Sequence, residues 1–307
     1  MSRLPTFTQD MDLVSLIEDF GSEAKCREYL EALRWPDGVR CPRCQSPKIS
    51  RIAKRHQFDC DGCRYQFSAT AGTIFNDSHL PLWKWFLAVY VMGESKKGIS
   101  ANQLKRMLNV SYKTAWYLCH RIRESMTSEM AAQLRGIIEA DETFIGGTKT
   151  HFGREPGEKS TVLGAVQRGG NVRLRMSDHT GKVRKRDVYD FLAVAVAPDA
   201  EAIYTDSAQV YDELADGDTR HASVNHGIGQ WVQADVHTNT IESVWSLFKR
   251  SVVGSYHHLS AKHLQSYLDE FAFRYDNRDN AYLFRDTLLR LIGAPPLEYA
   301  ELIAQGA

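Results

Sequence analysis

Two Cys-x-x-Cys pairs near the start of the chain limit what that segment can fold into. The pairs are Cys41 with Cys44 and Cys60 with Cys63, and fifteen residues separate them. Each pair can place two thiolates on one side of a tight turn, and two facing turns complete the tetrahedral sulfur set that zinc prefers in closed structural sites. Because so small a unit cannot fold on its apolar core alone, the metal must supply much of its stability. We therefore expect a zinc ribbon with one structural Zn²⁺ over residues 36–70.

A rubredoxin-like iron site and a redox dithiol are competing interpretations of the same pairs. No flavin-binding or thioredoxin-like βαβ pattern accompanies the cysteines, so structural zinc is favoured. The chain has six cysteines in all, and the other two, Cys26 and Cys119, lie singly in helical patterns. They are expected to be ordinary buried thiols.

The N-terminal sequence and the apolar runs bear on location. The first residues lack a basic-then-apolar signal layout, and runs such as 85–92 fall far short of the roughly 20 residues that cross a bilayer. A cytoplasmic protein is expected.

The overall net charge of zero conceals an asymmetry between the two halves of the chain. Residues 1–135 contain 20 Lys and Arg against 14 Asp and Glu, a net charge of +6, whereas residues 136–307 contain 18 against 24, a net charge of −6. A basic front half suggests a polyanionic partner, and an acidic back half is compatible with cation binding.

Helical patterns surround the cysteine segment. Residues 1–35 read as a lead-in of two short amphipathic helices broken at Gly21, with Ser22 as the cap of the second helix. Within 71–130, a compact buried helix at 81–93 precedes two further helices.

Residues 100–126 have the layout of a helix-turn-helix. Ser100 with Gln103 forms a capping-box pattern at the first helix, and Ser111 caps the second helix after a short turn. A plain packing hairpin has the same layout, but the neighbouring cysteine pairs and positive charge favour DNA binding. The expected DNA contacts are Lys113, Thr114 and Tyr117 on the reading face and Arg121 and Arg123 on phosphates.

Beyond residue 135 the pattern changes from helical to strand-like. Three strands are expected first, with a hairpin between the second and third, and after them helices alternate with strands. This order predicts a mixed α/β sheet flanked by helices over a domain at 135–292, with a tail at 293–307. The expected strands are 136–147, 160–170, 171–178, 202–207 and 220–227, and the expected helices are 185–197, 209–215, one beginning near 239, and 260–280.

Three acidic residues lie on these elements. Asp141 lies on the first strand, Asp206 closes the fourth, and Glu242 opens the helix after the fifth. Carboxylates that converge at one edge of a sheet can hold Mg²⁺ or Mn²⁺. Two such ions about 4 Å apart can activate an attacking oxygen and stabilise a leaving one in phosphodiester chemistry.

Other interpretations of the acids remain open. If Asn239 is the helix N-cap, Glu242 stands at the capping-box position and could reach back to the amide of residue 239. Glu139 shares the strand face of Asp141 and is a rival ligand, whereas Glu142 points to the other face.

Three stretches follow the Cys-x-x-Cys pairs and the helix-turn-helix pattern: ADETFIGG (140–147), YTDSAQVY (204–211) and HTNTIESVWSLFKR (237–250). Together, these features resemble a DDE transposase of the IS1595 family, the ISXO2-like group. The resemblance runs from the cysteine unit to about residue 292. It implies an RNase H-like catalytic core with Asp141, Asp206 and Glu242 as the metal-binding triad. Lys249 is similar to a lysine that follows the glutamate by seven residues in many such enzymes and contacts DNA near the scissile phosphate.

Some family features do not match. Asp235 and Thr238 stand where some DDE recombinases have a tyrosine and an arginine. Related elements can have Asn in place of the last acid, so Asn239 is a further candidate for the metal site.

The resemblance predicts a transposase that cleaves and joins DNA strands with two Mg²⁺ or Mn²⁺ ions. Its partners would be double-stranded DNA, both element ends and target, and it would act as a homodimer or higher oligomer. The alternative is a non-enzymatic DNA-binding regulator, built from the zinc ribbon and the helix-turn-helix, with an inactive RNase H-like body. A stand-alone nuclease without strand transfer would use the same acids.

Overall fold

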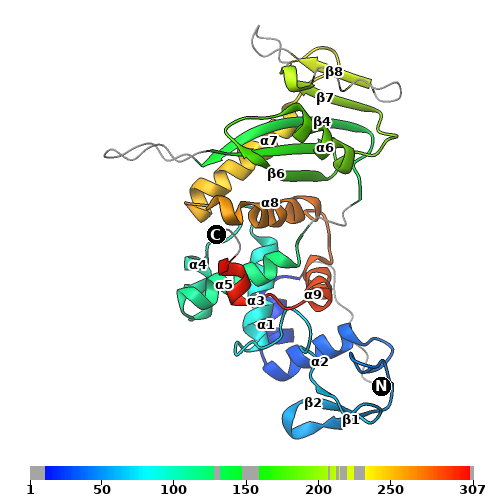
Figure 1. Cartoon of the computed structure of the whole chain (residues 1–307). Coiled ribbons are helices and arrows are strands. Elements are labelled where there is room, and N and C mark those ends of the chain that lie inside the picture. Colours follow the sequence, from blue (N-terminus) through cyan, green and yellow to red (C-terminus); the bar gives the residue numbers. More distant parts are fainter. Residues whose placement is uncertain are drawn as a thin grey trace. The chain divides into compact units, whose positions relative to one another are not determined.

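The computed structural model consists of two compact units (Figure 1). It describes residues 11–127, 132–146, 159–206, 208–211, 214, 220–224 and 232–304. The first unit joins Met1–Met126 to Asp279–Ala307, and the second is Thr127–Arg278. The predicted domain end at 292 is therefore too late. The chain returns to the first unit at Asp279 because the helix that follows buries Phe284 against Phe20 and Phe86 of that unit.

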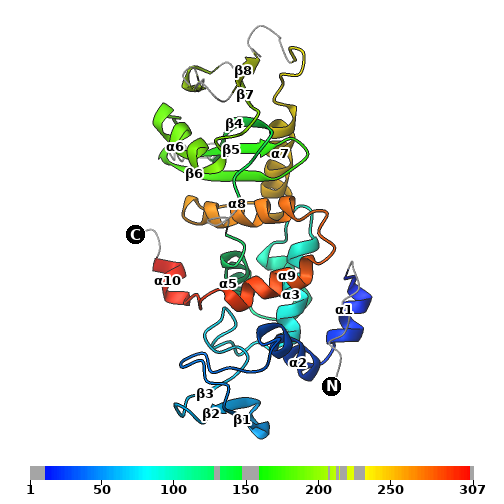
Figure 2. The ribbon, with the colours of Figure 1, turned by 90° about the vertical axis from the view of Figure 1, so that its right-hand side faces the viewer.

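The zinc-ribbon segment of the first unit is a small antiparallel sheet. Its strands are β1 (Ile49–Ile52), β2 (Gln57–Cys60) and β3 (Gln66–Phe67), in the order β1-β2-β3 (Figure 2). The short helix η1 (Ala53–Arg55) forms the tip between β1 and β2. The ring centroids of Phe58 and Phe67 each lie within 6 Å of the centroid of Trp35. This aromatic cluster is small, as expected for a unit that depends on metal.

The remainder of the first unit is helical. The three predicted serine caps are confirmed, since Ser22, Ser100 and Ser111 each accept a hydrogen bond from the amide three residues ahead. Asn109 adopts a left-handed conformation and ends the first helix of the predicted helix-turn-helix. The helices are α1 (Leu13–Phe20), α2 (Glu23–Arg34), α3 (Leu82–Glu94), α4 (Ala101–Leu108), α5 (Tyr112–Glu124), α9 (Leu283–Gly293) and α10 (Tyr299–Ala304).

The second unit is built on a five-stranded sheet in the order β6-β5-β4-β7-β8. β4, β5 and β6 are antiparallel neighbours, whereas β7 runs parallel to β4, and β8 runs parallel to β7. The predicted meander followed by alternating helices and strands is thus confirmed. The strands are β4 (Ile137–Gly146), β5 (Lys159–Gln167), β6 (Val172–Thr180), β7 (Ala202–Asp206) and β8 (Arg220–Val224).

Helices cover both faces of this sheet. α6 (Lys185–Ala195) packs on one face, and α7 (Asn239–Ser251) and α8 (Ala261–Asp276) pack on the other (Figure 2). A π-helical turn, η4 (Val252–Tyr256), extends α7. Of the predicted helix at 209–215, the structure has the short helix η2 (Gln209–Tyr211), and most of the rest lies outside the described residues. This mixed sheet between two helical layers is the RNase H-like fold that the family resemblance implied.

No helix in the described part of the chain has both the length and the apolar character required to cross a membrane.

Candidate functional site

Asp141 and Asp206 lie on neighbouring parallel strands. The register of β4 and β7 pairs Glu139 with Tyr204. Asp141 and Asp206 come two residues later on their strands, and side chains two residues apart point to the same face. The strand pairing therefore brings these two acids to the same end and face of the sheet.

The carboxyl group of Asp141 is largely enclosed and surrounded by negative charge. Burial raises its pKa to about 7, and the charges of Glu142 and then Asp206 act in the same direction. The indole Nε1 of Trp245 on α7 donates a hydrogen bond of 2.9 Å to Asp141 Oδ2, which acts against the shift. Placing a carboxylate where its charged form is disfavoured needs a compensating group, and perturbed acids of this kind concentrate at functional sites.

Glu142 approaches the same end of the sheet from the opposite face. Its carboxylate accepts a hydrogen bond from the hydroxyl of Tyr211, which belongs to the apolar cluster under α6. Burial raises the pKa of Glu142, and the charge of Asp206 adds to this. The predicted opposite orientation of Asp141 and Glu142 is confirmed. Among the residues that the structure describes, no Lys, Arg or His forms an ion pair with Asp141, Glu142 or Asp206.

Glu242 lies in the first turn of α7, but it does not form the predicted capping box. Thr238, not Asn239, occupies the N-cap position, and no side chain caps the helix from that residue. Glu242 Oε1 accepts a hydrogen bond of 3.1 Å from the Thr238 hydroxyl. The capping prediction for Asn239 is wrong because a residue from the sheet provides the cap.

That residue is Glu139, whose side chain is fully buried. Its Oε2 accepts hydrogen bonds from the amides of Thr240, at 2.7 Å, and Ile241, at 3.1 Å. Its Oε1 lies 2.7 Å from Nε of Arg168, which donates to it. Both oxygens are occupied by protein donors, so Glu139 anchors the start of α7 and has little capacity left for a cation.

Lys249 lies two turns after Glu242 on α7, and its side chain is exposed. Whether it contacts DNA stays a prediction. In the described ranges, the four cysteines of the zinc ribbon are the one group of three or more metal-ligating side chains whose donor atoms lie within 4.8 Å of one another. The acids at the sheet end are thus less tightly gathered than the cysteines.

The four cysteine thiols have the spacing of a tetrahedral zinc site. The Sγ atoms of Cys41 and Cys63 are 3.6 Å apart, and those of Cys44 and Cys60 are 3.5 Å apart. Four sulfurs at Zn–S bonds of about 2.3 Å would be roughly 3.8 Å from one another. The donor set therefore fits zinc without rearrangement.

The predicted DNA-contacting residues of α5 separate into two groups. Lys113 and Thr114 are exposed at the start of the helix, with Nζ of Lys113 4.2 Å from the ring centroid of Tyr299. Tyr117 is half-buried, and its hydroxyl donates to the carbonyl of Leu297.

Arg121 and Arg123 have exposed fractions of only 4% and 2%. The Arg121 guanidinium donates to the carbonyls of Ile74 and Asn76. The prediction that these arginines reach phosphates is wrong because both side chains are buried. Helical periodicity could not show that the loop after the zinc ribbon covers Arg121.

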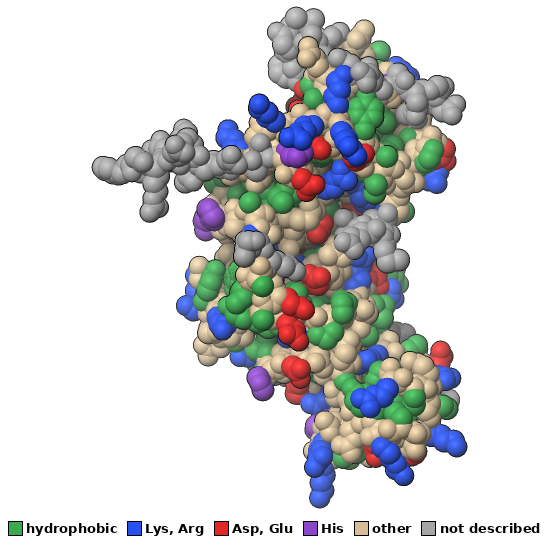
Figure 3. Space-filling view, in the orientation of Figure 1, with side chains coloured by type: hydrophobic (Ala, Val, Ile, Leu, Met, Phe, Trp, Pro, Cys, Tyr) green, Lys and Arg blue, Asp and Glu red, His purple; other side chains and the backbone are tan. Residues whose placement is uncertain are grey.

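The zinc ribbon carries much of the positive charge of the front half of the chain. Residues 36–70 contain seven Lys and Arg against three Asp, a net charge of +4. Figure 3 shows Lys and Arg side chains projecting around this part of the surface. All seven are exposed: Arg40, Arg43, Lys48, Arg51, Lys54, Arg55 and Arg64.

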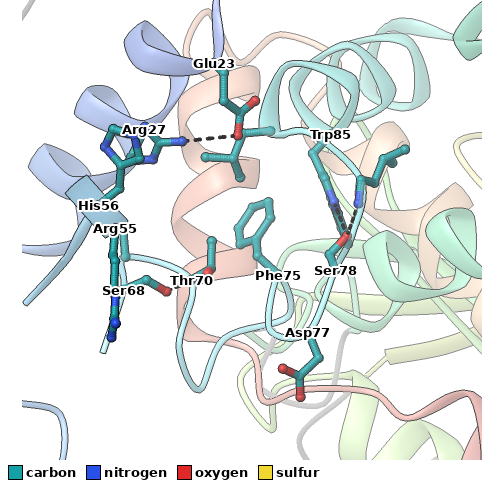
Figure 4. Close-up of a pocket in the computed structure, with 13 residues that line it drawn as sticks. Glu23, Arg27, Arg55, His56, Ser68, Thr70, Phe75, Asp77, Ser78 and Trp85 are labelled. Carbon is teal, nitrogen blue, oxygen red and sulfur yellow. Dashed lines mark hydrogen bonds and ion pairs between the residues drawn. The ribbon is translucent and has the colours of Figure 1, made fainter. Parts of the chain in front are cut away.

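A cavity of about 240 Å³ lies between α2, the tip of the ribbon hairpin and the loop that follows the ribbon (Figure 4). Arg27 and Arg55 line it, but so do Glu23 and Asp77, and the charges balance. Arg27 is paired with Glu23 at 3.7 Å. This cavity lacks the acidic cluster found at the end of β4 and β7.

A zinc ribbon joined to an RNase H-like sheet, with half-buried acids on neighbouring strands, is the architecture of a transposase. Residues 133–276 match the model of the ISXO2-like transposase domain, and residues 21–66 match the transposase zinc-ribbon domain. The chain belongs to the IS1595 family of transposases, the ISXO2-like group.

A relative and two solved structures are similar to this chain. An uncharacterized protein in transposable element ISH50 of Halobacterium salinarum is 31% identical over 279 residues, covering 84% of this chain and 92% of that protein. The Mos1 strand transfer complex has a TM-score of 0.31 and 11% identity, covering 68% of this chain and 75% of that chain. A pre-cleavage Mos1 transpososome has a TM-score of 0.28 with the same identity and coverage.

Proposed function

We propose that this chain is the transposase of an insertion sequence, which cleaves DNA at the element ends and joins the freed ends to a target. Asp141, Asp206 and Glu242 hold two Mg²⁺ or Mn²⁺ ions. The observation that carries the proposal is the pair of half-buried acids that repel each other, Asp141 on β4 and Asp206 at the end of β7. The pKa of Asp141 is raised to about 7 there, and no described Lys, Arg or His forms an ion pair with Asp141 or Asp206.

The donor set suits divalent metal ions. Carboxylate oxygens are the preferred ligands of Mg²⁺ and Mn²⁺, and a bound cation would offset the burial and the repulsion that raise the pKa of Asp141. Such ions supply the activation of an attacking oxygen and the stabilisation of a leaving oxygen in phosphodiester cleavage. Glu242 lies in the first turn of α7, the same helix that contacts Asp141 through Trp245, and this common helix supports its role as the third ligand. Lys249 on α7 would contact the DNA near the scissile phosphate.

DNA binding is assigned to the first unit. The net charge of +4 on residues 36–70 and the exposed Lys113 and Thr114 support contacts to phosphates and grooves. Double-stranded element ends and target DNA are the substrates, and pairing of two ends implies a homodimer or a higher oligomer on DNA. The protein would meet these substrates in the cytoplasm, at the nucleoid.

The experiment is strand cleavage of a labelled element end with Mg²⁺, together with a DNA-binding assay and a thermal melt for each variant. Asp141→Asn, Asp206→Asn and Glu242→Gln each remove a negative oxygen ligand and are expected to abolish cleavage while folding and DNA binding persist. Appreciable cleavage by folded Glu242→Gln protein would remove Glu242 from the triad. Product analysis on paired donor ends then separates a transposase, which joins strands, from a nuclease that only cuts.

A further inference from the structure

The side chain of Trp245 connects α7 to Asp141. Trp245 is buried, with an exposed fraction of 5%, in the apolar cluster between the sheet and helices α7 and α8. Within that cluster its one polar atom, Nε1, donates to Asp141 Oδ2 at 2.9 Å. An ionised carboxylate has about four acceptor positions, so this bond leaves capacity for a cation on the same group.

The position opposite Asp141 on the adjacent strand is occupied by glycine. The register of β4 and β5 pairs Asp141 with Gly164. A Cβ atom at Gly164 would lie 2.5 Å from two indole carbons of Trp245, Cζ2 and Cη2, a distance that side chains do not tolerate. Glycine weakens a strand interior, so its presence in β5 is explained by the close approach of another group. Here that group is the indole.

The contact also fixes α7 relative to β4 at a second point. Glu139 holds the amides of Thr240 and Ile241 at the start of the helix. Asp141, two residues further along the same face of β4, holds Trp245. Glu242 lies in the sequence between these anchors, so both ends of its turn are tied to the strand that carries Asp141.

We propose that Trp245, which occupies the space left by Gly164, is a positioning residue. It sets the orientation of the Asp141 carboxylate and the position of Glu242 relative to that carboxylate. The inference rests on the proposed function, because the orientation matters only if these acids hold catalytic metal. A purely structural tryptophan would affect stability alone. A positioning residue affects metal-dependent turnover in protein that is folded and bound to DNA.

Three variants isolate the contact. Trp245→Phe removes the N–H and part of the ring, whereas benzothienylalanine at position 245 keeps the ring size and removes only the N–H. Gly164→Ala keeps Trp245 and displaces it from Asp141. Phe248→Leu is the matched control, because Phe248 is fully buried in the same cluster and packs on the ring of Phe271.

The first measurement is the indole ¹⁵N–H spectrum of the full chain, which does not depend on activity. The chain has six tryptophans, and the resonance absent from Trp245→Phe identifies Trp245. We expect this resonance to move in Asp141→Asn and in Gly164→Ala and to stay in place in Phe248→Leu. A resonance unaffected by Asp141→Asn would overturn the contact, and with it the proposal, whatever the activity of the protein.

The second measurement is the cleavage rate at saturating DNA as a function of Mn²⁺ concentration. Loss of a hydrogen bond to a charged group, with a displaced metal ligand, is expected to lower the rate roughly 10- to 100-fold and to raise the half-saturating Mn²⁺ concentration in all three variants. Phe248→Leu should melt at a lower temperature but cleave at the wild-type rate.

The outcomes separate the two proposals. Wild-type protein that cleaves, alongside a folded benzothienylalanine variant with an unchanged rate and metal dependence, overturns the positioning role and leaves the proposed function intact. In the other outcome, the wild-type protein binds DNA and never cleaves it, although the Trp245 resonance responds to Asp141→Asn. This result contradicts the proposed function and overturns the catalytic positioning role. The contact between Trp245 and Asp141 still stands.

Discussion

Glu139 and Asp141 lie two residues apart on one face of β4, but their surroundings give them opposite electrostatic roles. Glu139 is paired with Arg168 and accepts from the first amides of α7. Asp141 has a single hydrogen-bond donor from α7 and lies beside two further acids. The first carboxylate is stabilised by the protein as it stands, whereas the second needs a cation that the described residues do not supply.

The difference predicts opposite stability changes in metal-free protein. Glu139→Gln leaves Arg168 without its buried partner, so the free energy of unfolding should fall by on the order of 3 kcal/mol. The measurement is chemical denaturation with a divalent-metal chelator present. In the double variant with Arg168→Met, part of the loss should be recovered because the stranded charge is also removed. If Glu139→Gln is neutral or stabilising, Glu139 returns as a candidate metal ligand.

The raised pKa of Asp141 makes the stability of the metal-free protein depend on pH. Its pKa is raised from 3.8 in the unfolded chain to about 7 in the folded protein, so the folded state binds the proton more tightly between these values. The resulting stability is present below about pH 4 and is lost as the pH rises to about 7. Metal-free wild type should therefore lose on the order of 2 kcal/mol relative to Asp141→Asn between about pH 5 and about pH 8.

Thermal melts of the two proteins over this pH range test the expectation. Mg²⁺ added at the upper end should raise the melting temperature of the wild type and leave that of Asp141→Asn nearly unchanged, because it binds the charged carboxylate. Parallel pH profiles for the two proteins would show that Asp141 titrates normally.

At the scale of elements, α5 contains both exposed and internal basic side chains, which should respond differently to substitution. Lys113 is exposed, and Lys113→Ala should weaken binding to the element end and reduce the slope of log affinity against log salt by about 1. Arg121→Ala should instead lower the melting temperature, because it leaves the carbonyls of Ile74 and Asn76 without their donor.

Salt titrations of DNA binding and melts of both variants separate these effects. A salt slope unchanged in Lys113→Ala would indicate that the start of α5 packs against other parts of the protein without touching DNA. Reduced binding by Arg121→Ala at a temperature where it is fully folded would restore Arg121 as a DNA contact.

At the scale of the whole molecule, the two units depend on different sources of stability. The sheet of the second unit has extensive apolar clusters on both faces. The zinc ribbon has only a small cluster around Phe58 and Phe67, together with the four cysteines.

A zinc-selective chelator added to the full chain should therefore unfold the ribbon and leave the sheet unit intact. Metal analysis should give one zinc per chain before treatment, and Cys60→Ser should reproduce the effect of the chelator. Zn²⁺ should restore the lost structure, whereas Mg²⁺ should not. Full retention of structure in zinc-free protein would contradict the structural role of the metal.

The sequence by itself determined the features that depend on local pattern. The two Cys-x-x-Cys pairs predicted the ribbon because ligand spacing is a local property, and the serine caps and the order of strands followed from residues close in the chain. Strand alternation placed Glu142 on the face opposite Asp141 for the same reason. The roles of Asp141, Asp206 and Glu242 came from the family resemblance and are still predictions.

Only the tertiary structure decided which partners these residues meet across long sequence separations. Glu139 caps a helix about 100 residues away, which displaced Asn239 from the cap that local spacing favoured. The loop after the ribbon encloses Arg121, which helical periodicity left on an accessible side of α5. Sequence pattern shows which side of an element a residue occupies, but burial and pairing depend on what packs there, and that is decided when the whole chain folds.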